Sequence, residues 1–256
     1  MTLPTAIAFD SDNTLSISKQ TITPEMAALL AQLTYKIPTA IISGAGMPQY
    51  LSQIISLLPA ETCYKNLYLF PSTGAACFIS RDSHWDPLYT HTIPEAAALR
   101  VMKVVEQALL DTRVIAGEPR YGEIIENRGA SIAVSALGQH APVAAKEAWD
   151  PDHKKREEVV AIIQPLLPDF EVRIGGMTTI DITLKGIDKG YAMKWFSEYL
   201  NVPITSMVYV GDALYEGGND ASVIPTGIAT YPVENPTGTE QLITQLLSTT
   251  NGATRG

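Results

Sequence analysis

The chain is poor in the residues that build disulfide frameworks and zinc sites. Cysteine occurs only twice, at Cys63 and Cys77, and neither lies in a CxxC pair or a His/Cys cluster. This pattern favours two reduced thiols. The four histidines show no metal-ligand spacing.

Basic residues and long apolar runs are also scarce. Lys and Arg number 18 against 27 Asp and Glu, so the formal net charge is −9. This balance argues against a nucleic-acid partner, because phosphate backbones attract basic patches. No apolar run approaches the roughly 18 residues that cross a bilayer, and the polar stretch FDSD begins at Phe9, too early for a signal peptide. We therefore expect a cytoplasmic protein without a membrane partner.

What is present is the composition of a globular protein, with 46% hydrophobic residues in a chain of 256. The first part alternates short apolar runs with helical patterns. Strands are predicted over 5–9, 39–43 and 66–70, and helices over 23–36 and 51–58. Strands separated by helices of this length predict a parallel sheet with right-handed crossovers.

The middle of the chain has a different pattern. Helical stretches at 95–110 and 152–167 accompany alternating apolar and polar runs at 131–138, 170–175 and 178–184, which are typical of antiparallel strands. The strand-helix alternation then returns. The sequence thus predicts an α/β protein with a Rossmann-like core, at residues 1–86 and 187–256, interrupted by an α+β domain at residues 87–186.

Residues suited to chemistry follow the predicted strands. Asp10 and Asp12 stand side by side after the first strand, and their repulsion costs free energy unless a cation or a proton intervenes. In parallel sheets ligands bind beyond the carboxyl ends of the strands. The other candidates near such ends are Ser43, Gly44, Lys189, Asp212, Asn219 and Asp220.

Together these residues form a coherent set for phosphoryl transfer. Carboxylate oxygens are the ligands that Mg²⁺ prefers, and a lysine with a hydroxyl suits phosphoryl oxygens. Asp10 could attack phosphorus while Asp12 moves protons. Taken singly, each of these residues also has a structural interpretation without a role in catalysis. Ser43 could be a helix N-cap, Asn219 and Asp220 could cap the next helix, and Lys189 could be a solvated surface lysine.

Four motifs in order make the chain resemble the haloacid dehalogenase superfamily of phosphoryl-transfer enzymes. They are DSDNT (10–14), SG (43–44), Lys189 and GDALYEGGND (211–220). Asn13 stands where the superfamily usually has glycine, and asparagine tolerates a left-handed backbone well.

Within the superfamily the chain resembles the branch with a type-B (C2B) α+β cap, and especially eukaryotic-type phosphomannomutases. SKQTITPEM (18–26), IENRGASIAVSALGQ (125–139), GGMTTID (175–181) and GIDKGYAM (186–193) carry this likeness. The resemblance implies that Asp10 is the nucleophile and Asp12 the acid/base. It also implies that Mg²⁺ is held by Asp10, Asp12 and Asp212, with Asp220 in support.

For the cap, the resemblance implies that Arg128, Thr179 and Asp181 hold a hexose phosphate and that the caps form a homodimer. The alternatives are an ordinary ion pair for Arg128, a plain strand residue for Thr179 and a loop cap for Asp181.

Three departures from the family bear on the reaction: Gln139, Lys146 and Lys19 all stand where the mutases carry arginine. A mutase must hold a bisphosphorylated intermediate by either end, and neither glutamine nor lysine replaces a bidentate guanidinium. We therefore predict a Mg²⁺-dependent phosphatase of a small phosphorylated metabolite, namely a sugar phosphate. A phosphohexomutase is the alternative. A non-catalytic metabolite-binding protein ranks below both, because it would be expected to lose Asp10 or Asp212.

Overall fold

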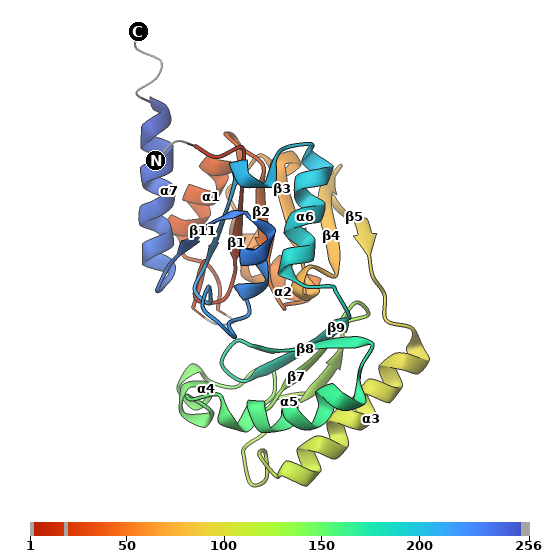
Figure 1. The fold of residues 1–256 in the computed structure, drawn as a ribbon. Coiled ribbons are helices and arrows are strands. Elements are labelled where there is room, and N and C mark those ends of the chain that lie inside the picture. The colour runs from red at the N-terminus through yellow and green to blue at the C-terminus, as the bar shows by residue number, and fades with distance from the viewer. Residues whose placement is uncertain (1–2, 18–19, 252–256) are drawn as a thin grey trace. The chain divides into compact units, whose positions relative to one another are not determined.

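The computed structural model describes residues 3–17 and 20–251, and the chain forms two compact units (Figure 1). The core unit comprises Met1–Tyr89 and Lys189–Gly256, and the inserted unit comprises Thr90–Asp188. The predicted boundary between residues 86 and 87 falls inside strand β5 (His84–Thr90), most of which belongs to the core unit. Lys19 lies outside the described residues.

The core unit is built on a seven-stranded sheet of order β11-β10-β1-β2-β3-β4-β5. Its further strands are β1 (Ala6–Asp10), β2 (Thr39–Ile42), β3 (Leu67–Phe70), β4 (Ala76–Arg81), β10 (Met207–Gly211) and β11 (Ala229–Pro232). The pairs from β11 to β3 are parallel, and β3 pairs with β4 antiparallel. Because β1 lies between β2 and β10, the strand order reverses at β1, which is where such sheets bind ligands.

Alternate residues of β1 face two different layers of helices. Ile7 and Phe9 belong to an apolar cluster with helices α1 (Pro24–Thr34), α2 (Met47–Gln53) and α7 (Pro236–Asn251). Ala6 and Ala8 belong to a second cluster with helix α6 (Lys189–Leu200). Figure 1 shows α1 and α7 on one side of the sheet and α6 on the other. The predicted Rossmann-like α/β core is therefore confirmed.

The helix signals of the core are confirmed at α1 and only in part at α2. The Thr23 hydroxyl accepts a hydrogen bond from the backbone N–H of Met26 at 3.0 Å, and so caps α1 as predicted. The pattern over 51–58 places the helix too late in the chain, since α2 spans Met47–Gln53 and a 3-10 turn follows at Ile55–Leu57. Leu58 precedes a proline and is extended, because the proline ring disfavours the helical backbone before it.

The inserted unit has its own antiparallel sheet and core. Strands β6 (Ile125–Asn127), β7 (Ile132–Ser135), β8 (Phe170–Gly175) and β9 (Thr179–Leu184) pair in the order β6-β7-β9-β8. Helices α3 (Glu95–Thr112) and α5 (Lys154–Leu166) bury apolar residues against it, and α4 (Val143–Trp149) lies between them in sequence. The predicted α+β character of the insert is confirmed. None of the described helices has the length and apolar character needed to cross a membrane.

Candidate active site

The site lies at the carboxyl ends of the central strands of the core unit. Asp10 is the last residue of β1, Ser43 follows β2, and Asp212 follows β10. The Asp10 side chain is buried, and Thr14 donates a hydrogen bond to its Oδ2 at 3.4 Å. Parallel strands thus bring together residues that are about 200 positions apart in the chain.

Lys189, the first residue of α6, is held between two carboxylates. Its Nζ lies 2.5 Å from Asp10 Oδ1 and 2.7 Å from Asp220 Oδ1, and the side chain is 2% exposed. Burial acts to lower the pKa of Lys189, but the two carboxylates outweigh it and raise the pKa above its usual value. The ammonium therefore stays charged. The alternative of a solvated surface lysine is wrong.

Asp220 is fully buried and accepts three hydrogen bonds. Lys189 Nζ and the Tyr209 hydroxyl both donate to Oδ1, the hydroxyl at 2.5 Å, and the backbone N–H of Ala213 donates to Oδ2 at 3.1 Å. Burial and the Asp220 charge raise the pKa of Tyr209 well above its usual value, so the hydroxyl keeps its proton and donates it. Asp220 precedes the 3-10 turn η5 (Ala221–Thr226), but its side chain makes no capping hydrogen bond there. Its contacts are with the site.

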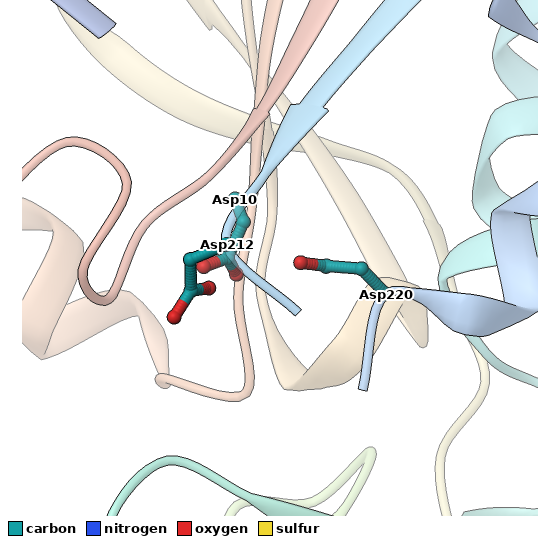
Figure 2. Close-up of side chains that lie close together, drawn as sticks. All are labelled: Asp10, Asp212 and Asp220. Atoms are coloured by element: carbon teal, nitrogen blue, oxygen red, sulfur yellow. The ribbon is translucent and has the colours of Figure 1, made fainter. Parts of the chain in front are cut away.

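Three carboxylates form a group that could hold a divalent cation (Figure 2). Asp10, Asp212 and Asp220 each offer an oxygen, and these oxygens lie within 4.8 Å of one another. With Lys189 nearby, the group carries two net negative charges when all its members are ionised. Burial is the largest cause that raises the pKa of both Asp10 and Asp212, and repulsion between the carboxylates adds to it, while Lys189 acts in the opposite direction without cancelling the rise. A divalent cation would balance this charge.

The donor set fits a hard cation such as Mg²⁺, because all its ligand atoms are oxygens. Asp220 accepts three hydrogen bonds on its two oxygens, whereas Asp10 accepts one on each oxygen and the one from Thr14 is long at 3.4 Å, which favours Asp10 and Asp212 as direct ligands and Asp220 as support. Asn219, in the same loop, has a buried Oδ1 with no hydrogen-bond partner, and this oxygen is one more acceptor in the segment.

The group of three carboxylates does not include Asp12. The Asp12 side chain is half-buried, and its backbone forms a bridge with Ser16. The next residue, Asn13, has φ of 60°, a left-handed backbone that asparagine tolerates well. The Asn13 side-chain amide also donates to Asp212 Oδ2 at 3.3 Å. Sequence reasoning explained the conformation of Asn13 but missed this contact, and the role of Asp12 as acid/base stays a prediction.

Ser43 is buried in the loop that Gly44 continues. Its Oγ accepts a hydrogen bond from the backbone N–H of Ala45 at 3.1 Å, and its carbonyl accepts one from Thr73 at 2.8 Å. Helix α2 begins only at Met47, with Gly46 at the cap position. The alternative that Ser43 is the N-cap of this helix is therefore wrong.

The inserted unit carries a separate polar cluster. Arg128 donates from Nε and Nη2 to Glu126 Oε2, at 3.0 and 2.7 Å, and Gln139 donates to the same oxygen at 2.9 Å. Arg128 thus forms an ion pair, which was the alternative to a role in binding a hexose phosphate. The pair is not on the open surface, because only 7% of the Arg128 side chain is exposed. Sequence reasoning missed Glu126, which lies two residues away on the same side of the segment.

Thr179 and Asp181 both lie on β9, Thr179 buried and Asp181 half-buried. A Cβ at Gly175, on the neighbouring strand, would collide with the Asp181 carboxylate, so a larger residue there would require the carboxylate to shift. Asp181 sits within the strand, so it does not cap a loop.

This fold, with Asp10, Ser43 and Asp212 at its strand ends and Lys189 at the start of α6, defines an enzyme of the haloacid dehalogenase superfamily that transfers phosphoryl groups. The family model described as eukaryotic phosphomannomutase matches residues 26–249. The chain therefore belongs to this family.

Individual relatives agree with this assignment. The chain is 24% identical to phosphomannomutase 1 of Dictyostelium discoideum, over 94% of this chain and 96% of that one. It is 22% identical to the phosphomannomutase of Saccharomyces cerevisiae, over 95% and 94%.

Similar solved structures show the same fold at lower identity. An IMP-bound IMP-nucleotidase of Plasmodium falciparum has a TM-score of 0.70 and 16% identity, covering 96% of this chain and 67% of that one. The C-terminal domain of trehalose-6-phosphate phosphatase from C. albicans has a TM-score of 0.66 and 15% identity, covering 95% and 92%.

Proposed function

We propose that this protein is a Mg²⁺-dependent phosphatase of a small phosphorylated metabolite, namely a sugar phosphate, and that it works in the cytoplasm. The observation that carries the choice of phosphatase is the environment of Arg128. Its guanidinium donates twice to Glu126, and Gln139, which donates to the same carboxylate, is uncharged.

The chemistry would take place in the core unit. The Asp10 carboxylate attacks phosphorus, the P–O bond to the sugar breaks, and Asp12 gives a proton to the departing oxygen. Asp12 then takes a proton from water as the water attacks the aspartyl-phosphate, which releases inorganic phosphate and restores Asp10. Mg²⁺, when bound, would neutralise charge on the phosphoryl oxygens. Lys189, already charged beside Asp10, would donate hydrogen bonds to the same oxygens.

The phosphate could leave with water or return to a sugar, and the cap bears on this choice. A mutase needs a second anion site, because it must hold a bisphosphorylated sugar by either end. In this cap Glu126 neutralises the charge of Arg128. Asp181 adds a further carboxylate, and Gln139 adds no charge. The balance among these four residues, Lys146 not included, favours a neutral polar ligand such as the hydroxyls of a sugar, and we propose that Arg128, Thr179 and Asp181 contribute to its recognition.

A phosphohexomutase acting on mannose phosphates is the second candidate. It is favoured by the relatives described above, which are named phosphomannomutases and align over nearly the whole chain. The two candidates share Asp10, Lys189 and the cation, and they differ in the fate of the phosphoryl group.

Phosphorus NMR separates the two. Mannose 6-phosphate and glucose 6-phosphate are incubated with the protein and Mg²⁺, with and without a hexose 1,6-bisphosphate. We expect inorganic phosphate to appear at the same rate in both conditions. Formation of a 1-phosphate that depends on the bisphosphate would contradict the phosphatase and establish the mutase.

We also propose that the protein forms a homodimer through the inserted unit, as its family resemblance implies. Light scattering on the purified protein tests this proposal, and a monomeric mass at micromolar concentration would contradict it.

A further inference from the structure

We propose that Tyr209 is a positioning residue for the reaction, and that its hydroxyl controls how Lys189 is shared between Asp10 and Asp220. The proposal rests on the proposed use of Asp10 as the nucleophile. It extends the site to a strand residue outside the four motifs.

The geometry places the Tyr209 hydroxyl and the Lys189 ammonium on one oxygen. Asp220 Oδ1 accepts from the hydroxyl at 2.5 Å and from Nζ at 2.7 Å, while the same Nζ lies 2.5 Å from Asp10 Oδ1. Tyr209, Asp220 and Lys189 are all buried. The four groups form one continuous chain of hydrogen bonds, shielded from solvent.

The hydroxyl weakens the hold of Asp220 on Lys189. A carboxylate oxygen that accepts from two donors shares its negative charge between them, so it attracts the cation less strongly than it would alone. Without the hydroxyl, Asp220 Oδ1 would have Lys189 as its one side-chain donor. The ammonium would then move toward Asp220, away from Asp10 and from the phosphoryl group that Asp10 accepts.

Packing alone does not explain a tyrosine at this position. The ring lies in the apolar cluster of β10 and α6 with Phe196 and Met193, where a phenylalanine ring would fill the same space. A hydroxyl buried there is costly unless it is hydrogen-bonded, and its partner is the carboxylate that holds Lys189. The hydroxyl therefore serves the site more than it serves the core.

Beryllium fluoride with Mg²⁺ tests the inference without a known substrate, since it mimics a phosphoryl group on an aspartate. Its affinity is measured by fluorine NMR for the wild type and for Tyr209→Phe. The matched control is Tyr68→Phe, which removes a hydroxyl from a buried tyrosine of the same apolar cluster. We expect about tenfold weaker binding for Tyr209→Phe and no change for the control, because hydrogen bonds to charged groups are strong.

A double-variant comparison separates positioning from a loss of packing. If Tyr209 acts through Asp220, then adding Tyr209→Phe to Asp220→Asn weakens binding no further. Three results would overturn the inference. Tyr209→Phe could bind as tightly as the wild type, or it could weaken binding as much in the Asp220→Asn background as it does alone. The third is that the wild type does not bind beryllium fluoride. Failure to hydrolyse any sugar phosphate, with the binding results as expected, would overturn the proposed function and leave this inference standing.

Discussion

Replacing Lys189 with methionine should destabilise the protein far more than a substitution at an exposed lysine. The side chain is 2% exposed and contacts Asp10 and Asp220 at 2.5 and 2.7 Å. Methionine fills a similar volume without charge, so Lys189→Met leaves three neighbouring carboxylates with no cation among them.

The size of the effect follows from the cost of a broken buried ion pair. Removing one partner typically costs about 3–5 kcal/mol, because the remaining charge is buried and unpaired. For a chain of this length each kcal/mol lowers the melting temperature by roughly 2–4 °C, so we expect a fall of roughly 6–20 °C. The carboxylates reduce this loss to the extent that they take up protons.

The assay is thermal unfolding followed by circular dichroism, with and without Mg²⁺, for the wild type, Lys189→Met and Lys194→Met. Lys194 lies on the same helix and is exposed, so its variant should melt within about 2 °C of the wild type. Mg²⁺ should raise the melting temperature of Lys189→Met more than that of the wild type, because the variant has one more uncompensated negative charge. A Lys189→Met protein that melts like Lys194→Met would refute the buried network.

Three further predictions follow from the same structure. Asp10→Asn should abolish turnover while the protein stays folded, and full activity in a phosphate-release assay would contradict the aspartyl-phosphate mechanism. The pKa values of Asp10 and Asp212 are raised above 3.8 in the folded state, so the metal-free protein loses stability as pH rises above that value. Mg²⁺ should therefore raise the melting temperature more at about pH 7.5 than at about pH 5, and an equal rise at both would count against the cluster. In the cap, Arg156 and Asp150 form a buried ion pair at 2.7 Å, and Arg156→Met should cost about 3–5 kcal/mol in urea unfolding. An unchanged midpoint would contradict this.

The convergence of the site residues at the strand ends was predictable from the sequence, because it follows from the order and direction of the strands. Short apolar runs separated by helices require parallel strands, whose carboxyl ends share one edge of the sheet. Asp10, Ser43 and Asp212 therefore converge without any knowledge of side-chain positions. Thr23 was predictable for a local reason, since its hydroxyl needs only the N–H three residues later.

Other contacts depend on tertiary packing that no local pattern encodes. Tyr209 lies in an apolar strand, so the sequence assigns it to the core. Its hydroxyl has a hydrogen-bond acceptor because the loop after β10 brings Asp220 next to it. The hydrogen bond from the Asn13 side chain to Asp212 also joins two segments that are far apart in the sequence. The convergence of Gln139 on Glu126 likewise required a loop whose path the sequence does not specify.

Trapping the phosphorylated enzyme tests the central claim most directly. The protein is mixed with mannose 6-phosphate or glucose 6-phosphate and Mg²⁺, quenched, reduced with borohydride and mapped by mass spectrometry. An aspartyl-phosphate is reduced to homoserine, so the account predicts homoserine at position 10 only when substrate and Mg²⁺ are both present. Homoserine at position 12, or phosphate release with no reduction at either aspartate, would contradict the assignment of Asp10 as the nucleophile.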